Sequence, residues 1–390
     1  MKANAGEVYT VYNQYLKRYT ACQVAYTLTR FWATGEPCLW ITDPEQIGMP
    51  KMEFVGGHPD EYCIFLKNLT ETELAQITSL DGAPLDVKKE LRQFLTGKDN
   101  PMALQDKKIM PPPWLAHREI ERYSIGWRMG YGEDYIDRFG DWLDTLSPEE
   151  RTEYRTLFPE PVTWKGWWDD EDRVEVLTHG DFLVEAWQPE GRPKYTRQWF
   201  QQEFTAGRKR ELCLFWGHQP AQDGQLTKSC LSQWWMEDFY TTADSYLCME
   251  QYMMAAKAEL FGDKEIRDQI LKCSDQKQIK ALGRKVRGFD QKVWDKFKYA
   301  IVLLGNWHKF SQNRELREFL LSTGDSVLVE ASPYDAIWGI RLAACSPEAQ
   351  DPIKWRGQNL LGFALMEVRD ELRRVTQNEM LCDWSTVWQQ

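Results

Sequence analysis

Nineteen tryptophans, spread from Trp32 to Trp388, constrain the fold of this chain more than any other feature. A tryptophan side chain carries a large apolar surface, so most of the nineteen must be buried in hydrophobic cores. With 390 residues, the chain also exceeds what one core usually serves. We therefore expect two domains, and a single tryptophan in this chain is weak evidence of a site.

The polar segment QPEGRPK at 188–194 contains a glycine and two prolines and predicts the boundary between the domains. Residues 1–190 are expected to form a separate, tryptophan-rich mixed α/β domain, and residues 195–390 a mainly helical domain, which gives an α+β chain. In the first domain we predict helices over 9–32, 70–80, 85–95 and 119–157, strands at 38–42, 51–55 and 61–66, and a hairpin over 173–187. In the second domain, strands are predicted at 212–217 and 326–331, and the closing helix over 359–375.

Charge and cysteine usage limit the possible partners. A net charge of −11 argues against binding nucleic acid over the whole surface, although one local basic pocket remains compatible with it. Nine scattered cysteines without a CxxC motif favour reduced thiols and a cytoplasmic location. The opening residues lack the apolar core of a signal peptide, and the run YAIVLL at 299–304 is far too short to cross a membrane.

Several common chemistries have no motif in this chain. There is no GxxxxGK[ST], no GxGxxG after a strand and no GxSxG. The five histidines stand far apart, with no HExxH and no zinc-site spacing. We expect no metal and no cofactor, and metal binding by carboxylates alone has no support in the pattern.

A carboxylate in an apolar setting is the first positive signal. Glu250 lies in the middle of the predicted helix YLCMEQYMMAAKA, where most of its neighbours are apolar. Burial of such a carboxylate raises its pKa and suits it to proton transfer. Lys257 follows seven residues later on the same helix face, about 10 Å away by helical rise. The plain alternative is a surface Glu and Lys on an amphipathic helix.

Two further segments carry acidic, basic and aromatic residues together. In SPYDAIWG at 332–339, Asp335 is either a turn cap beside a core Trp338 or a catalytic carboxylate beside an aromatic platform. The segment KALGRKVRGFDQKVWDKFK at 280–298 is strongly basic and contains Arg284 and Trp294. In an acidic protein, such a segment suggests a phosphate-bearing ligand, although a basic helix is often only a solvated surface.

Together these residues show a family resemblance. From about Leu212 to Leu372 the chain resembles the YbiA-like, or NADAR, superfamily, through YLCMEQYMMAAK, KALGR, Trp294, RELREFLLSTG, LVEASPYDAIWG and NLLGFALMEVRDEL in the family's order. The resemblance implies a compact, mainly helical α+β domain that cleaves N-glycosidic bonds. Family substrates are phosphoribosylamino-pyrimidine intermediates of riboflavin synthesis, or ADP-ribose joined to guanine bases.

By position, the resemblance implies that six residues are functional: Glu250, Lys257, Arg284, Trp294, Asp335 and Trp338. The chain departs from the family in two places. It has Met-Glu-Gln-Tyr at 249–252 where the family has Ser-Glu-His-Tyr, and its glycine-rich loop before the final helix is reduced at 354–359.

The expected function is hydrolysis of a ribosyl C1′–N bond. Glu250 and Asp335 form the carboxylate pair, Arg284 holds phosphate, and Trp294 and Trp338 hold the base. Lys257 either holds phosphate and orients Glu250, or attacks C1′ to form an imine. The expected partner is a free nucleotide, with nucleic acid a substrate only if it carries the modified base. Two alternatives remain: a non-catalytic module that binds NAD or ADP-ribose, and an interaction protein built on the tryptophan-rich first half.

Overall fold

The computed structural model describes residue 104 and residues 107–169, 184, 186–221 and 225–387, and before them only seven strands between residues 7 and 79. The chain divides into two compact units. The first unit comprises Met1–Pro111, Gly140–Pro159 and Gln377–Gln390, and the second comprises Pro112–Phe139 and Glu160–Thr376. The domain boundary predicted at 188–194 stays a prediction.

The seven strands of the first unit form two antiparallel sheets. One has the order β2-β1-β7, with β1 at Glu7–Asn13, β2 at Arg18–Val24 and β7 at Thr78–Ser79. The other has the order β3-β4-β6-β5, with β3 at Tyr26–Arg30, β4 at Pro37–Ile41, β5 at Met52–Phe54 and β6 at Tyr62–Phe65. The three strands predicted at 38–42, 51–55 and 61–66 are confirmed by β4, β5 and β6.

The helix predicted over 9–32 is wrong, because β1, β2 and β3 occupy that stretch. Its valines, threonines and tyrosines fit a pleated surface better than a helix. The helices predicted at 70–80 and 85–95 lie outside the described residues, apart from the two strand residues of β7.

The segment between the sheets and the second half contains two helices of more than two turns. Helices α4 (Tyr131–Asp144) and α5 (Pro148–Leu157) confirm the later part of the helical prediction for 119–157, whereas residues 119–130 form turns and one short helical turn. Helix α5 begins at a capping box, in which Ser147 and Glu150 satisfy each other's backbone N–H groups. Most of the hairpin predicted at 173–187 lies outside the described residues. Its described end is wrong, because Val184, Ala186 and Trp187 are helical and Gln188 N donates to Val184 O at 2.8 Å.

The second unit is mostly helical with few short strands. Its longer helices are α7 (Arg197–Thr205), α8 (Met249–Leu260), α9 (Lys264–Leu271), α10 (Gln276–Gly283), α11 (Gln291–Gln312), α12 (Arg314–Ser322) and α13 (Leu360–Thr376). Short helical turns lie at α3 (Pro113–Ala116), η3 (Ile125–Trp127), η4 (Val162–Trp164), η5 (Lys228–Leu231) and η6 (Pro347–Gln350). The strands are β8 (Leu212–Phe215), β9 (Phe239–Tyr240), β10 (Ser245–Tyr246) and β11 (Val327–Glu330). Strands β8 and β11 and helix α13 confirm the predictions at 212–217, 326–331 and 359–375.

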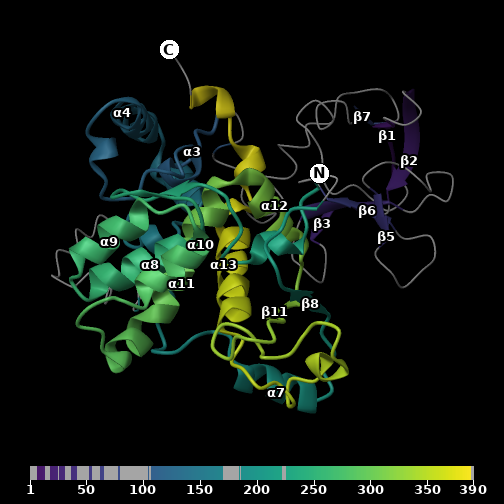
Figure 1. Ribbon diagram of the computed structural model, residues 1–390. Coiled ribbons are helices and arrows are strands. Elements are labelled where there is room, and N and C mark those ends of the chain that lie inside the picture. Colours follow the sequence, from purple (N-terminus) through teal and green to yellow (C-terminus); the bar gives the residue numbers. More distant parts are fainter. Residues whose placement is uncertain are drawn as a thin grey trace. The chain divides into compact units, whose positions relative to one another are not determined.

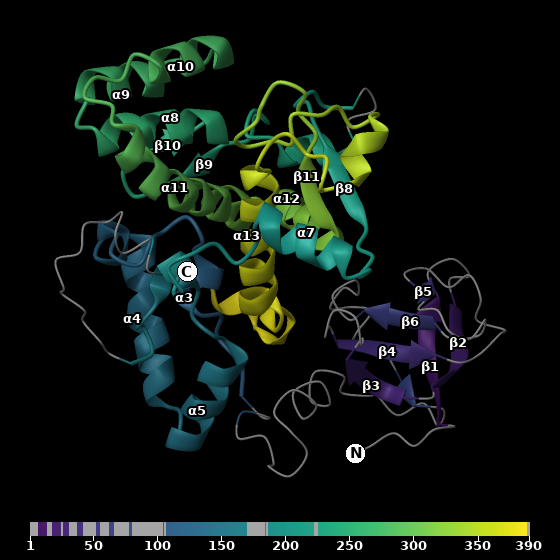
Figure 2. The same ribbon diagram turned by 90° about the horizontal axis from the view of Figure 1, so that it is seen from below.

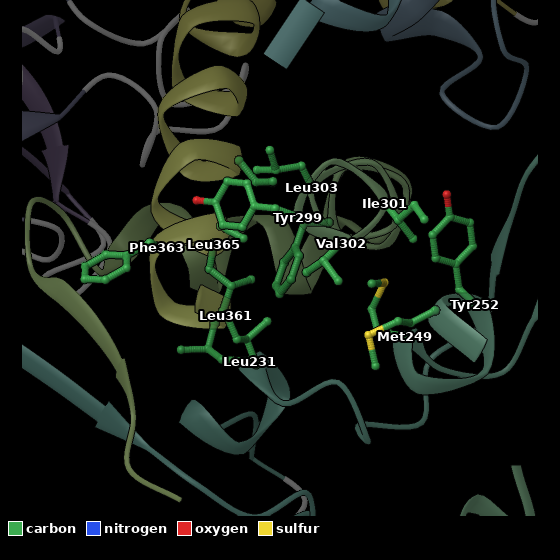
Figure 3. Close-up of a cluster of buried hydrophobic side chains, with 14 of the residues drawn as sticks. Leu231, Met249, Tyr252, Tyr299, Ile301, Val302, Leu303, Leu361, Phe363 and Leu365 are labelled. Atoms are coloured by element: carbon green, nitrogen blue, oxygen red, sulfur yellow. The ribbon is translucent and has the colours of Figure 1, made fainter. Parts of the chain in front are cut away.

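Helix α13 runs between the α8–α11 group and the parallel pair of β8 and β11 (Figures 1 and 2). Apolar side chains of α8, α11 and α13 gather into one core (Figure 3). Two glycines permit this close packing. A Cβ on Gly305 would lie 2.5 Å from the Tyr252 ring, and a Cβ on Gly362 would lie 2.0 Å from the Leu328 carbonyl oxygen. The core thereby fixes α8 and β11, which carry the site residues.

Within the described part of the chain, no helix is long and apolar enough to cross a membrane.

Candidate active site

The edge of the small parallel sheet is where the candidate site begins. Strand β11 pairs with β8 in parallel, with Glu330 opposite Phe215. Parallel strands that run together end at the same edge of the sheet. Glu330, the last residue of β11, and Trp216, the first residue after β8, therefore both lie at this edge. Trp216 is 55% exposed and lies 6.3 Å from the ring of Tyr334, which is 86% exposed. The edge therefore carries a carboxyl group beside two exposed aromatic rings.

Glu250 is buried in the first turn of α8. Its side chain is 3% exposed, and its backbone N–H donates to Gln233 O at 2.8 Å. The Oε1 atom of Glu250 is buried and has no hydrogen-bond partner among the described residues. Burial raises the pKa of Glu250 to about 7, with Lys280 lowering it, Asp335 raising it and Arg284 lowering it. The predicted burial of Glu250 is therefore confirmed, and the surface-helix alternative is excluded.

Asp335 caps the turn that follows β11. Its Oδ1 atom accepts from the backbone N–H groups of Ile337 and Trp338, both at 2.8 Å. Asp335 therefore caps the turn, which is one of the two roles that the sequence allows. The two capping hydrogen bonds use only the Oδ1 atom. The negative charge of Asp335 nevertheless acts on Glu250 and raises its pKa. The two predicted carboxylates thus lie in one electrostatic environment.

The turn folds back on the end of β11. Ile340 N donates to Glu330 O at 2.9 Å, and a Cβ on Gly339 would lie 2.8 Å from that same oxygen. Only a glycine fits so close an approach without a shift of the backbone. Asp335 is therefore held close to Glu330.

Asn359 ties this turn to the sheet and to α13. Its Nδ2 donates to Leu328 O at 2.9 Å, and its Oδ1 accepts from Glu330 N at 2.9 Å. The residue is fully buried and has a φ of 58°, in the left-handed region that asparagine tolerates well. Backbone bonds from 356–361 to 336–340 complete the clamp. The shortened loop at 354–359 therefore still positions the Asp335 turn.

Glu330 is a site residue that the sequence analysis missed. Its Oε2 atom is buried and has no partner among the described residues, although the residue as a whole is partly exposed. Burial raises the pKa of Glu330 to about 8, and the charges of Asp335 and Glu250 raise it while Lys280 lowers it. The only sequence signal was its place at the end of the strand VLVE, five residues before Asp335.

Helix α10 supplies the positive charge. Lys280 and the exposed Arg284 both lower the pKa of Glu250, and Lys280 Nζ lies 5.4 Å from the ring centre of Trp234. Arg284 was predicted as a phosphate holder, and its place at the exposed end of α10 leaves its guanidinium accessible. Lys280 is a second cation that the sequence placed only within a broad basic segment.

Lys257 contacts the end of helix α10. Its Nζ donates to Gly283 O at 2.9 Å and stands 4.2 Å from the ring of Phe289 and 5.8 Å from that of Trp294. Partial burial lowers the pKa of Lys257. The described residues show no hydrogen bond or ion pair between Lys257 and Glu250. Lys257 therefore contacts the part of the site that contains Arg284, because it donates to the carbonyl oxygen of Gly283, the residue before Arg284.

The two predicted base-holding tryptophans are both half-buried against the core. Trp294 lies in the first turn of α11 beside Lys257, and Trp338 belongs to the Asp335 turn. Among the described side chains, no ring contact joins the two.

The departure at Gln251 is structural. Its Nε2 donates to the carbonyls of Ile270, Leu271 and Cys273 at the end of α9, at 3.0, 3.3 and 3.0 Å. Its Oε1 accepts from Leu247 N at 2.7 Å. The amide of Gln251 is therefore occupied in anchoring α8 to the end of α9.

No group of His, Cys, Asp and Glu in the described residues has the geometry of a metal site. A groove of about 820 Å³ lies elsewhere, lined by Val162 and by residues of 186–202 and 367–374, and includes none of the predicted site residues. One of its carboxyl groups, Glu367, accepts from Tyr299 Oη at 2.8 Å and Lys194 N at 2.9 Å. That carboxyl serves as an anchor for the chain before α7, whereas Glu250 and Glu330 each keep an unpartnered oxygen.

The second unit is thus mostly helical with few short strands, and it carries the carboxyl groups of Glu250, Glu330 and Asp335 on α8, at the end of β11 and in the turn that follows. The NADAR domain family matches residues 214–373. "N-glycosidase R617" from Acanthamoeba polyphaga mimivirus is 47% identical over 156 residues, which are 39% of this chain and 92% of that protein. "N-glycosidase YbiA" from Escherichia coli (strain K12) is 32% identical over 123 residues, which are 32% of this chain and 68% of that protein. The NMR structure of the E. coli protein YbiA covers 42% of this chain and 86% of that chain, with 26% identity and a TM-score of 0.34. The chain belongs to the NADAR family.

Proposed function

We propose that this protein is an N-glycosyl hydrolase that cleaves a ribosyl C1′–N bond. Relatives named N-glycosidase support this proposal, and R617 aligns with this chain over nearly its whole length. The observation that carries the proposal is the environment of Glu250. A buried carboxyl group with an unpartnered oxygen and a pKa of about 7 lies within the field of a second carboxylate, Asp335.

Cleavage of a C1′–N bond develops positive charge on the sugar and negative charge on the leaving base. The proposed roles follow from where the charges lie. Asp335 stabilises the oxocarbenium-like sugar with its free oxygen, and Glu250 activates water because its pKa lies near neutrality. Arg284 would hold a phosphate group through its fork of donors.

The remaining predicted residues complete the substrate site. Trp294 and Trp338 are proposed to hold the base by stacking. Lys257, with a lowered pKa, is proposed either to hold phosphate or to attack C1′ as a neutral amine. These roles favour a substrate with a phosphoribosyl or ADP-ribosyl group joined to a base, such as a riboflavin-synthesis intermediate or ADP-ribosylated guanine.

The test is incubation of the purified protein with N-ribosides, their 5′-phosphates, NAD and ADP-ribosylated guanine nucleotide, with product masses read out. Release of a free base from a phosphate-bearing member supports the proposal. Tight binding without any product would show a non-catalytic nucleotide-binding module. A protein that neither binds nor cleaves these compounds would favour the alternative that it is an interaction protein.

A further inference from the structure

Glu330 has the geometry of a group that handles protons. Strand β11 ends at this residue, and its backbone is fixed on both sides by the N–H bond to Asn359 Oδ1 and the C=O bond from Ile340 N, each 2.9 Å long. The Glu330 side chain therefore extends from a rigid part of the backbone. Yet its buried Oε2 atom has no partner among the described residues. A fixed carboxyl group with a buried, unpartnered oxygen is expensive to maintain for structure alone.

Three charged residues from three elements act on Glu330. Asp335 of the following turn and Glu250 of α8 both disfavour its ionised form, and Lys280 of α10 partly opposes them. Burial is the largest cause, and it raises the pKa of Glu330 to about 8. Near neutral pH, Glu330 therefore holds a proton. A carboxyl group that keeps its proton at neutral pH, with a buried oxygen that no other group uses, is suited to act as an acid.

We propose that Glu330 is the proton donor to the leaving base, an inference that rests on the N-glycosyl hydrolase function proposed above. In this step the C1′–N bond breaks and its electron pair goes to the base nitrogen, which takes the proton from Glu330. A water oxygen bonds to C1′, and the proton of that water goes to Glu250.

The resting state is restored by the return of one proton. After base release, Glu330 is ionised and Glu250 is protonated. Burial raises the pKa of Glu330, and the charge of Glu250 raises it further, so a proton that passes from Glu250 to Glu330 restores the starting arrangement. The sum of the steps is hydrolysis by one water molecule, and no other reactant is needed.

The first test uses Glu330→Gln, because glutamine has the shape and neutrality of a protonated glutamate but no transferable proton. We expect turnover of a purine or pyrimidine riboside phosphate to fall about 10²–10⁴-fold. A nitrophenyl riboside phosphate, whose leaving group needs no proton, should lose far less. Glu318→Gln, at an exposed carboxyl on α12 paired with Arg314, is the matched control and should leave both rates unchanged. Equal losses on both substrates, or no loss on the riboside, would overturn the donor role.

The second test requires no turnover. The infrared difference spectrum between wild type and Glu330→Gln at neutral pH should show the loss of a protonated carboxyl C=O band. Loss of a carboxylate band instead would overturn the inference. A wild-type protein that has the protonated band but cleaves no riboside would contradict the N-glycosyl hydrolase function while leaving the protonation of Glu330 established.

Discussion

Glu250 and Asp335 lie within one electrostatic field, although 84 intervening residues separate them in the sequence, and the charge of Asp335 raises the pKa of Glu250. Glu250 is carried by the first turn of α8, and Asp335 by the turn after β11. Both elements are fixed against α13 or its N-terminal loop, so their separation is set by the core.

The burial of Glu250 should cost stability above neutral pH. Its pKa is about 7 in the folded chain, against an ordinary value of 4.5, so the folded state binds more protons between those values. Stability from this group is therefore full below about pH 4.5 and is lost as the pH rises through about 7, a cost on the order of 3 kcal/mol. Glu250→Gln should then unfold at a higher temperature than wild type at about pH 8, with a smaller gain near pH 5. Thermal unfolding of both proteins at the two pH values measures this, and an equal change at both would contradict the buried, titrating Glu250.

Lys257 should be chemically distinguishable from an ordinary surface lysine. Burial lowers its pKa, which favours the neutral amine needed to attack C1′. We expect borohydride added during turnover to trap a sugar adduct on Lys257, seen by peptide mass, and Lys257→Arg to lose turnover. No adduct from an active enzyme, together with a fully active Lys257→Arg variant, would leave only the phosphate-holding role.

Trp294→Ala should weaken binding of ligands that carry a base by about 1–3 kcal/mol and leave ribose 5-phosphate binding nearly unchanged. The reason is that stacking requires a planar ring on the ligand. Calorimetry with the two ligands makes the comparison. Equal losses for both would show that the half-buried Trp294 serves the core and not the base.

The addition of one methyl group at the contact between α13 and β11 should destabilise the protein. A Cβ on Gly362 would lie 2.0 Å from Leu328 O, a backbone atom held in the sheet. We expect Gly362→Ala to lower the free energy of unfolding by at least about 1–3 kcal/mol. Gly140→Ala, in α4 with no atom within 4 Å of the added Cβ, is the control and should be neutral or stabilising by about 0.5–1 kcal/mol. Denaturant unfolding decides, and similar effects from both changes would refute the close approach.

Local pattern was enough to predict much of the second unit. The apolar run before Asp335 predicted β11, the helical spacing after Asn359 predicted α13, and the apolar neighbours of Glu250 predicted its burial. Each depends on residues close together in the sequence. The helix predicted over 9–32 is wrong, because the valines, threonines and tyrosines of that stretch favour the strands that it forms.

The missed site residues depend on contacts that are distant in sequence. Glu330 belongs to the site through the charges of Glu250 on α8 and Lys280 on α10, which are both distant from it in the sequence. Asn359 acts through two hydrogen bonds to β11 that no local pattern indicates. Gln251 shows the opposite case, since a departure within a family motif concerns only helix packing.

We propose that Glu250 and Asp335 together catalyse hydrolysis of a ribosyl C1′–N bond. The most direct test is to measure the rate at which wild type, Glu250→Gln and Asp335→Asn release free base from the best phosphate-bearing riboside. Circular dichroism confirms that each variant is folded. Because Asp335→Asn keeps the Oδ1 acceptor for the turn, it tests the charge and not the cap. We predict that wild type releases the base and that each folded variant loses at least about 10²-fold in rate. Two folded variants that release the base at the wild-type rate would contradict the account.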